Sequence, residues 1–291
     1  MKIALFGSIF SEHYTKYIKH LIKKLNDQNV SIYIHEEFYE FLEKYIILPG
    51  DITTFKELTD HENIDYVFSI GGDGTLLKSA TFVKDSLIPI LGINTGRLGF
   101  ISSISTDQID IAIDNVLKKE YKIISRTVLE LETDNNLFGD FNFALNEVAV
   151  VKKDTSSMIR IDAFINDEFL NSYWADGLLV ATPTGSTGYS LSCGGPIVLP
   201  ETNNIIIAPI APHNLNVRPI IINDDSTIRL KIEDRDDLAL VSLDSRSRAF
   251  DSSVTLKIKK SDFCINLIEP KNHSFIRTIQ SKLMWGSDKR N

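Results

Sequence analysis

Residues 65–75, with the sequence DYVFSIGGDGT, decide the fold of this chain. Residues 65–70 form the short apolar run of a buried strand, residues 71–75 form a glycine-rich turn, and residues 76–80 begin a helical pattern. Glycines at three of the four positions 71–74 allow positive φ angles and let a ligand come close to the main chain. The N–H groups that open the helix lack intrahelical partners and lie at the positive end of the helix dipole, so the turn suits phosphate oxygens.

Asp73 places a carboxylate in the middle of this anion site. Because an unpaired carboxylate would repel phosphate, two functional roles remain: holding a divalent cation that bridges the phosphates, or accepting the proton of an attacking hydroxyl. Both roles belong to phosphoryl transfer. The structural alternative is that Asp73 only ties an ordinary turn together. The turn is neither a P-loop, since no Gly-Lys-Ser/Thr follows, nor the dinucleotide fingerprint, whose third glycine would fall at Leu77.

The composition is that of an ordinary globular protein, with 43% hydrophobic and 24% charged residues, and 291 residues are enough for two cores. The net charge of −8, without a compensating basic run, disfavours a large nucleic-acid footprint and leaves small charged ligands. No apolar stretch reaches the length of a membrane span, and the apolar start of the chain is too short for a signal peptide. With only two cysteines, we expect a cytoplasmic protein with no nucleic-acid or membrane partner.

Strands alternate with helices in the first 118 residues. The apolar periods predict strands at 2–6, 31–35, 65–70 and 89–93, and helices at 11–27, 36–45, from 76 and at 106–118. Such alternation predicts a parallel, doubly wound sheet, in which ligands bind at the carboxyl ends of strands. A second glycine loop, residues 94–100 (NTGRLGF), follows the last of these strands. We expect it to form a wall of the cleft beside Asp73; the alternative is a plain loop with Arg97 as a surface cation.

From Tyr121 the period changes to that of strands. Runs rich in β-branched residues predict strands at 122–132, 141–151, 158–165, 169–173, 178–181, 205–207, 220–222, 227–232, 238–243, 254–258 and 264–267. This second part is therefore a β domain. A final helix at 274–283 carries an apolar face that needs a surface to cover.

Asn146 and Glu147 interrupt an otherwise apolar strand. Adjacent side chains point to opposite faces unless the strand bulges or ends there. Burying these two side chains without hydrogen-bond partners would cost about 1–3 kcal/mol or more, so each side chain needs a partner. A sugar diol or adenine is one candidate partner, and a polar edge of the sheet is the other.

The densest polar cluster runs from Trp174 to Ser192, with Asp176 before a buried strand and the loop TPTGSTGYSLS after it. Its hydroxyls and bare N–H groups can donate and accept hydrogen bonds, and Tyr189 offers a flat face for stacking on a base. We therefore predict a binding loop, against the alternative of a solvated loop. Asp244, at the end of a later strand, could supply one more acid to the cleft.

Taken together, these motifs resemble, in order and spacing, those of the NAD kinase family. The set consists of GGDGT at 71–75, Asn94-x-Gly96-x-Leu98-Gly99-Phe100, Asn146-Glu147, Asp176-Gly177, the loop at 182–190 and Ala208-Pro209-x-x-Pro212-His213. The glycine-Asp turn is shared with related diacylglycerol kinases, sphingosine kinases and 6-phosphofructokinases. The Asn-Glu pair and the Thr-Pro-Thr-Gly-Ser-Thr loop are what distinguish NAD kinases.

The resemblance implies an α/β domain with a Rossmann-like parallel sheet and the GGDGT turn over residues 1–125 and 264–291. It implies an all-β, sandwich-like, NAD-binding domain over residues 126–263, with the C-terminal helix returning to the first domain. It further implies transfer of a phosphoryl group from ATP, or another donor, to the adenosine 2′-hydroxyl of NAD with a divalent cation, Mg²⁺ in the first place, giving NADP. A homo-oligomer, dimer or tetramer, is the family expectation. The ligands of the metal are left unassigned.

By the matched positions, Asp73 would be the general base, and Gly72, Gly74 and Lys78 would meet phosphates. The residues that would hold the dinucleotide are Asn146, Glu147, Trp174, Asp176, Thr187, Gly188, Tyr189, Ser190, Leu191, Ser192 and Arg246.

The chain departs from the family pattern at three of these positions. Gly188 stands where alanine is usual, Trp174 where arginine is frequent, and Arg246 where glutamine is common. The contact of Trp174 then becomes stacking in place of charge, and the choice between NAD and NADH stays open.

Two other functions remain as alternatives. One is a small-alcohol or lipid kinase of the same superfamily; against it stand the Asn146-Glu147 pair and the lack of an amphipathic membrane-binding helix. The other is a non-catalytic dinucleotide sensor, against which stands the intact Asp73.

Overall fold

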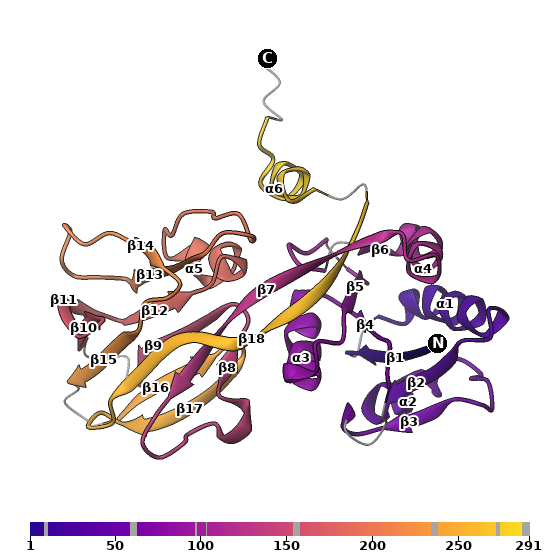
Figure 1. Cartoon of the computed structure of the whole chain (residues 1–291), viewed down its shortest axis with the longest axis horizontal. Coiled ribbons are helices and arrows are strands. Elements are labelled where there is room, and N and C mark those ends of the chain that lie inside the picture. The colour runs from indigo at the N-terminus through magenta and orange to yellow at the C-terminus, as the bar shows by residue number, and fades with distance from the viewer. Residues whose placement is uncertain are drawn as a thin grey trace. The chain divides into compact units, whose positions relative to one another are not determined.

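The computed structural model describes residues 1–8, 11–58, 63–96, 98–102, 104–153, 158–233, 238–271 and 274–286. The chain divides into two compact units, one formed by Met1–Ser125 with Ile265–Asn291 and the other by Arg126–Cys264. Two long strands, β7 (Tyr121–Glu132) and β18 (Leu256–Pro270), run from one unit into the other (Figure 1). Each unit has its own hydrophobic core.

The first unit is built on a parallel sheet. Its strands are β1 (Lys2–Gly7), β2 (Ser31–His35), β3 (Thr53–Phe55), β4 (Tyr66–Ile70), β5 (Ile90–Asn94) and β6 (Ile104–Ser105). The order across the sheet is β3-β2-β1-β4-β5-β18, and β6 also pairs with β5. The pairings between β1 and β2, β1 and β4, and β4 and β5 are all parallel, which confirms the predicted α/β class. The short and largely exposed β3 was not predicted.

Helices cover both faces of this sheet. They are α1 (Thr15–Asp27), α2 (Glu36–Leu42), α3 (Asp73–Val83) and α4 (Ile109–Leu117), with short 3₁₀ turns η1 (Glu12–Tyr14), η3 (Lys84–Ser86) and η4 (Thr106–Gln108). A further helix, α6 (Phe275–Leu283), follows β18 near the end of the chain. Alternation along β1 sends Ile3 and Leu5 into one core with α1 and α4, while Phe6 on the other face meets Phe82 of α3 at a ring-centroid distance of 4.6 Å. The sheet is therefore doubly wound.

The C-terminal helix α6 belongs to the first unit, as the resemblance implied. Thr278 and Ile279 are its buried residues, and Ile276 is 52% exposed. The ammonium of Lys282 donates to the carbonyl of Leu98 and lies 4.7 Å from the centre of the Phe100 ring. The helix thus contacts the second glycine loop.

The strand order reverses between β1 and β4. From β1 the chain moves to β2 and β3 on one side, and then to β4 on the other side of β1. The segments that leave the carboxyl ends of β1 and β4 therefore diverge, which opens the crevice where ligands of such sheets bind.

The second unit is a sandwich of antiparallel strands. One sheet has the order β14-β13-β12-β9-β16-β17, and the other contains β11-β10-β15-β18, with β7 and β8 paired beside it. The strands are β8 (Phe143–Ala144), β9 (Glu147–Lys152), β10 (Ile159–Ile165), β11 (Glu168–Ala175), β12 (Gly177–Ala181), β13 (Asn204–Ile210), β14 (Ile220–Asn223), β15 (Ile228–Glu233), β16 (Leu238–Leu243) and β17 (Arg246–Asp251).

The core between these sheets takes side chains from both, such as Val150 and Leu178 from one and Ile161 and Leu230 from the other. Alternate residues of β12, such as Leu179, enter a second cluster on the opposite face of the sheet. Burial on both faces explains why residues 178–181 are all apolar.

The strand predictions for this unit were wrong at three places. The strand predicted at 141–151 is broken between β8 and β9, and the two strands predicted at 254–258 and 264–267 form the continuous β18. Arg246 opens β17, a strand that was not predicted.

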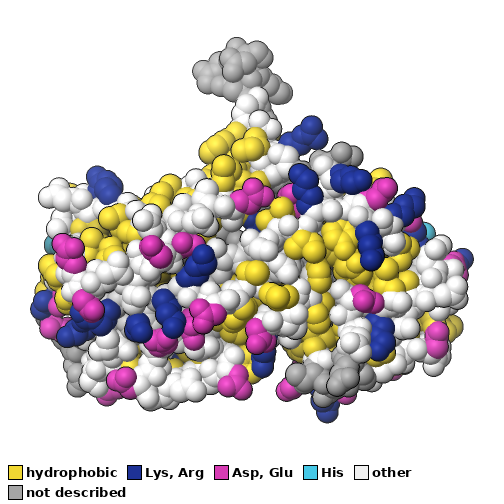
Figure 2. Space-filling view, viewed as in Figure 1, with side chains coloured by type: hydrophobic (Ala, Val, Ile, Leu, Met, Phe, Trp, Pro, Cys, Tyr) yellow, Lys and Arg dark blue, Asp and Glu magenta, His cyan; other side chains and the backbone are white. Residues whose placement is uncertain are grey.

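Figure 2 shows basic and acidic side chains interspersed over the face drawn. Ion pairs of the second unit include Lys257 with Glu132 and Arg160 with Glu233, both at 2.8 Å. Exposed pairs contribute at most about 1 kcal/mol each, so the two cores supply most of the stability. Within the described ranges, no helix is long and apolar enough to cross a membrane.

Candidate active site

The GGDGT turn follows β4 and leads directly into α3. The helix begins at Asp73 with Gly72 as its N-cap, earlier than the sequence predicted, so the orphan N–H groups lie within the turn itself. Only Gly71 needs to be glycine on conformational grounds, because its φ is +154° and a Cβ there would collide with Thr75. Nothing lies within 4 Å of where a Cβ of Gly72 or Gly74 would stand. The main chain at these two glycines is therefore open to a ligand.

Asp73 ties this turn to the second glycine loop. Its Oδ2 accepts from the backbone N–H of Phe100 at 2.8 Å, and its Oδ1 accepts from those of Ser102 at 2.9 Å and Ile101 at 3.3 Å. Gly99 leaves no room for a Cβ, which would overlap the Asp73 carboxylate. The carboxylate thus has the linking role that the sequence left open, with the second loop as its partner. Since a carboxylate offers about four acceptor sites, one remains for a hydroxyl.

Lys78 lies on α3, just over one turn after Gly74, and its exposed side chain lines a recess at the end of β1. Arg97, expected as a surface cation or part of the cleft wall, lies outside the described residues. Across the part of the chain that the structure describes, no group of three or more His, Cys, Asp or Glu side chains could hold a metal ion.

In the second unit, Asp244 explains why the strand predicted at 141–151 is interrupted. Its carboxylate accepts from the backbone N–H groups of Asn146 at 2.7 Å, Leu145 at 2.9 Å and Glu147 at 3.2 Å. These donors turn towards Asp244, which itself has a φ of +53°. The sequence offered Asp244 only as a residue that could supply one more acid to the cleft, and it missed this structural role. The only signal was an acid directly after a buried strand.

Glu147 is buried, with 9% of its surface exposed, and its carboxyl accepts from the backbone N–H of Tyr189. Burial, followed by the nearby charge of Asp244, raises the pKa of Glu147 from 4.5 to about 8. At neutral pH the side chain is therefore mostly protonated and can donate a hydrogen bond. Among the described atoms, Oε2 of Glu147 and Oδ1 of Asn146 have no hydrogen-bond partner. Such buried atoms without partners are costly in isolation and fit a polar ligand.

The loop at 182–192 packs against this pair. The hydroxyl of Thr182 donates to the carbonyl of Leu145 at 2.6 Å, and the backbone N–H of Thr182 donates to the carbonyl of Asn146 at 2.9 Å. The loop continues as η6 (Thr184–Thr187) and α5 (Tyr189–Ser192). These bonds fix the loop beside Asn146 and Glu147.

Gly188 lies where a Cβ would stand 3.1 Å from Oε2 of Glu147 and 3.3 Å from Nδ2 of Asn146. Glycine therefore leaves extra space beside these polar groups. Tyr189 is 43% exposed, and the buried Oγ of Ser190 has no partner in the described part. The predicted residues Gly188 to Ser190 thus gather around the Asn146-Glu147 pair.

The remaining predicted residues differ in how far they are available to a ligand. Asp176 forms an ion pair with Lys152 at 2.6 Å, and the hydroxyl of Thr187 donates to the carbonyl of Thr184 at 3.3 Å. Leu191 is half-buried and Ser192 is exposed. Burial raises the pKa of Tyr189, and the nearby charge of Asp176 adds to this shift.

Trp174 and Arg246 are the two unusual residues. Trp174 lies on β11 with 51% of its surface exposed, so its ring is available for stacking. The Arg246 guanidinium donates to the carbonyl of Phe141 at 2.6 Å and to that of Phe143. Burial lowers the pKa of Arg246. Two of its nitrogens therefore hold the backbone around β8, which the sequence did not foresee.

The structure thus assembles two sets of predicted residues. Gly72, Asp73, Gly74 and Lys78 lie together at the start of α3 in the first unit, with open space beside the two glycines. In the second unit, the set around Asn146 and Glu147 combines buried polar atoms that lack partners with an exposed aromatic ring. The first set suits phosphates, and the second suits a ligand with hydroxyl or amide groups and a flat base.

Two family models match the chain: the ATP-NAD kinase N-terminal domain over residues 10–121 and the ATP-NAD kinase C-terminal domain over residues 145–270. The NAD kinase of Cytophaga hutchinsonii is 51% identical over 292 residues, covering 100% of both chains. That of Flavobacterium johnsoniae is 46% identical over 294 residues, again with 100% of both chains covered.

The solved structures that resemble this chain include members of the same family. The crystal structure of yeast NADH kinase complexed with NADH has a TM-score of 0.89 at 25% identity, covering 99% of this chain and 88% of that one. An NAD kinase from Archaeoglobus fulgidus in complex with ATP has a TM-score of 0.76 at 26% identity, covering 98% of this chain and 99% of that one. The chain belongs to the ATP-NAD kinase family.

Proposed function

We propose that the chain transfers the γ-phosphoryl group of ATP to the 2′-hydroxyl of the adenosine ribose of NAD, giving NADP. The observation that carries this proposal is the cluster of buried polar atoms without partners at Asn146, Glu147 and Ser190, which a dinucleotide would satisfy. Family membership supplies the reaction class.

On the phosphate side, the open N–H groups at Gly72 and Gly74 and the ammonium of Lys78 would hold phosphate oxygens. The hydroxyl proton would pass to the remaining acceptor site of Asp73. The hydroxyl oxygen then bonds to the γ-phosphorus, the bond from that phosphorus to the bridging oxygen breaks, and ADP leaves. A loose transition state of this kind depends mainly on positioning and neutralisation of charge.

A divalent cation, Mg²⁺ in the first place, would be held by phosphate oxygens and water, as Mg²⁺ commonly is in phosphoryl-transfer sites. This mode of binding fits a site whose turn offers one acid, Asp73, already engaged by three N–H groups. The cation would neutralise the charge on the phosphates.

On the dinucleotide side, Asn146 and the protonated Glu147 would bind hydroxyl or amide groups of NAD. Tyr189 and Trp174 would stack on its rings, and Asp176 with residues 187–192 would form the surrounding wall. Arg246 would act by holding the backbone at Phe141 and Phe143.

We further propose an α/β phosphate-binding domain over residues 1–125 and 264–291 and an NAD-binding domain over residues 126–263, in a cytoplasmic homo-oligomer. The family motifs and the two compact units support this arrangement of domains.

The test is formation of NADP by the purified full-length chain from NAD, ATP and Mg²⁺, read with an NADP-specific dehydrogenase. That enzyme distinguishes the 2′-phosphate from other products. We expect NADP to accumulate with ATP present and none without it. NAD binding in calorimetry without any NADP formed would contradict the proposal and favour the sensor function.

A further inference from the structure

Residues 98–102, at the end of the second glycine loop and just after it, carry the three backbone N–H groups that the Asp73 carboxylate accepts. The position of this 98–102 segment therefore decides where the carboxylate points. The segment is neither helix nor strand, so its position depends on contacts with its neighbours. Two elements of the first unit supply such contacts, β5 and the C-terminal helix α6.

The strand β5 holds the end of the 98–102 segment. A Cβ on Gly92 of this strand would stand 2.9 Å from Cα of Ser102 and 3.3 Å from the carbonyl oxygen of Ile101, so the backbone of the segment lies directly against the strand. The buried Asn94 side chain, at the end of the strand, donates to the carbonyl of Ser102 at 3.3 Å. The segment is therefore fixed to the sheet at its last residue.

Lys282 of α6 holds the beginning of the segment. Its ammonium donates to the carbonyl of Leu98 and lies 4.7 Å from the centre of the Phe100 ring. The N–H of Phe100 donates the shortest of the three hydrogen bonds to Asp73, at 2.8 Å. Phe100 thus has the Lys282 cation against its ring and the Asp73 carboxylate on its backbone, and it links the C-terminal helix to the candidate general base.

The charge of Lys282 is directed to this segment. Within the part of the chain that the structure describes, Lys282 forms no ion pair with a carboxylate. Its half-buried ammonium is stabilised by the Leu98 carbonyl and the Phe100 ring, since a cation binds to both kinds of group. The helix itself buries two residues, Thr278 and Ile279. Lys282 is therefore a polar link between a lightly buried helix and the segment.

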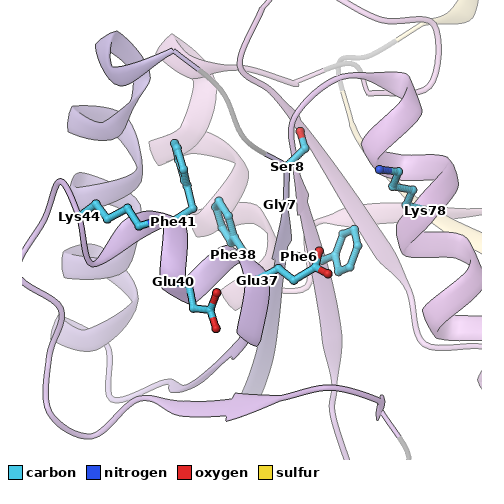
Figure 3. Close-up of a pocket in the computed structure, with 9 residues that line it drawn as sticks. All are labelled: Phe6, Gly7, Ser8, Glu37, Phe38, Glu40, Phe41, Lys44 and Lys78. Carbon is cyan, nitrogen blue, oxygen red and sulfur yellow. The ribbon is translucent and has the colours of Figure 1, made fainter.

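Lys282 differs from Lys78, which the proposed function assigns to the phosphates. The exposed Lys78 side chain points from α3 into the recess at the carboxyl end of β1, where a ligand can reach it (Figure 3). The ammonium of Lys282 is instead bound to groups of the protein itself. The two lysines therefore suit different roles, one on a ligand and the other on the loop that holds Asp73.

We propose that Lys282 is a positioning residue for the phosphoryl transfer: by fixing Leu98 and Phe100, it keeps the N–H groups of the 98–102 segment aimed at the Asp73 carboxylate. The inference rests on the proposed function and gives the C-terminal helix a part in it. Without the ammonium, β5 would still hold the end of the segment, while Phe100 would be free to move. Asp73 would then shift relative to the hydroxyl whose proton it accepts, and a misplacement of about 1 Å can cost about 10²-fold in rate.

The test changes Lys282 in the full-length chain. Lys282→Met removes the ammonium, and Arg277→Met is the matched control, since Arg277 is an exposed cation of the same helix. Lys282→Arg is the conservative variant, because a guanidinium also donates to a carbonyl and stacks on a ring. Steady-state rates would be measured with ATP and NAD each varied, in the wild type and in the Asp73→Asn background. Phe100→Leu, which removes the ring and keeps the N–H, serves if Lys282→Met fails to fold in thermal melting.

We expect kcat to fall about ten- to a hundredfold in Lys282→Met, with the KM for ATP and the KM for NAD changed by less than about twofold. In Lys282→Arg and in Arg277→Met, kcat should stay within about threefold of the wild type. In the Asp73→Asn background, Lys282→Met should change kcat by less than about twofold, because the carboxylate through which Lys282 acts is gone.

An unchanged kcat in whichever of Lys282→Met and Phe100→Leu folds would overturn this role of Lys282. An equal fall of kcat in the Asp73→Asn background would also overturn it, since Lys282 would then act through some other group. A fall of the same size in Arg277→Met would trace the effect to the helix as a whole and likewise contradict the proposal. These results differ from failure of the proposed function, in which the wild type forms no NADP from NAD and ATP.

Discussion

Asp73 in the first unit and Asp244 in the second use the same hydrogen-bonding device. Each carboxylate accepts three backbone N–H groups of a loop far away in the sequence: Asp73 from residues 100–102 and Asp244 from residues 145–147. The surroundings differ. Asp73 stands beside two open glycines at the start of a helix, whereas Asp244 lies next to the buried Glu147 and helps raise its pKa to about 8.

The difference shows how one device serves two purposes. At Asp73 the bonds orient a carboxylate that still has an acceptor site beside the phosphate turn, so the acid itself can take part in the reaction. At Asp244 the bonds shape the end of a strand, and the acid acts through Asn146 and Glu147. Asp73 is therefore a candidate catalytic residue, and Asp244 is a positioning residue.

The largest expected effect comes from Asp73→Asn. Loss of the general base should lower kcat by about 10²- to 10⁴-fold. The new amide also places N–H groups against backbone N–H donors, which should lower the free energy of unfolding by about 1–3 kcal/mol. Steady-state kinetics and urea unfolding measure the two effects. A kcat within threefold of the wild type would remove Asp73 from the chemistry.

Asp244→Asn is the matched change in the second unit. It should cost a similar free energy of unfolding, about 1–3 kcal/mol, and raise the KM for NAD about tenfold, because the turn that carries Asn146 and Glu147 loses its anchor. The value of kcat at saturating NAD should stay within about threefold. A collapse of kcat with an unchanged KM for NAD would show that Asp244 acts directly in the reaction.

Glu147 makes the stability of the folded chain depend on pH. An acid whose pKa is raised on folding stabilises the folded state fully at any pH below its pKa in the unfolded chain. This stability is lost as the pH rises through its pKa in the folded chain. For Glu147 the window runs from 4.5 to about 8. Over this range the wild type should lose up to about 5 kcal/mol relative to Glu147→Gln.

Urea unfolding at several pH values from 4.5 to 8 checks this prediction, with the exposed Glu201→Gln as control. Parallel stability profiles of the wild type and Glu147→Gln would mean that Glu147 is ionised at neutral pH.

The smallest expected effect is that of Gly188→Ala. The added Cβ would stand 3.1 Å from Oε2 of Glu147, so the side chain must move by a few tenths of an ångström. We expect the free energy of unfolding to change by less than about 1 kcal/mol and the KM for NAD by a few-fold. Gly50→Ala, with nothing within 4 Å, is the control. A loss of NAD binding would show that the extra space at Gly188 is required.

The sequence predicted the parts of the molecule that depend on local pattern. Alternating strands and helices up to residue 118 and the change of period at Tyr121 predicted the two classes of sheet, because burial of one or both faces imposes these periods. The sequence also predicted the glycine-rich turn, although among its glycines only Gly71 has a positive φ.

Contacts between distant segments could not be predicted in this way. The bonds of Asp73 join residues 27 to 29 positions apart, and those of Asp244 span 97 to 99 positions, so no local spacing reveals them. Polar residues in the middle of β18, such as Lys260 and Ser261, made one strand look like two. The guanidinium of Arg246 is engaged by carbonyls more than 100 positions away, and only the folded chain shows this.

The most direct test compares Asp73→Asn and Asp244→Asn in one experiment, measuring both turnover at saturating NAD and ATP and the affinity for NAD by calorimetry. We predict that each variant loses a different property. Asp73→Asn loses turnover and still binds NAD, whereas Asp244→Asn keeps its turnover and binds NAD weakly. Equal losses of both quantities in the two variants would contradict the division between a reacting and a positioning carboxylate.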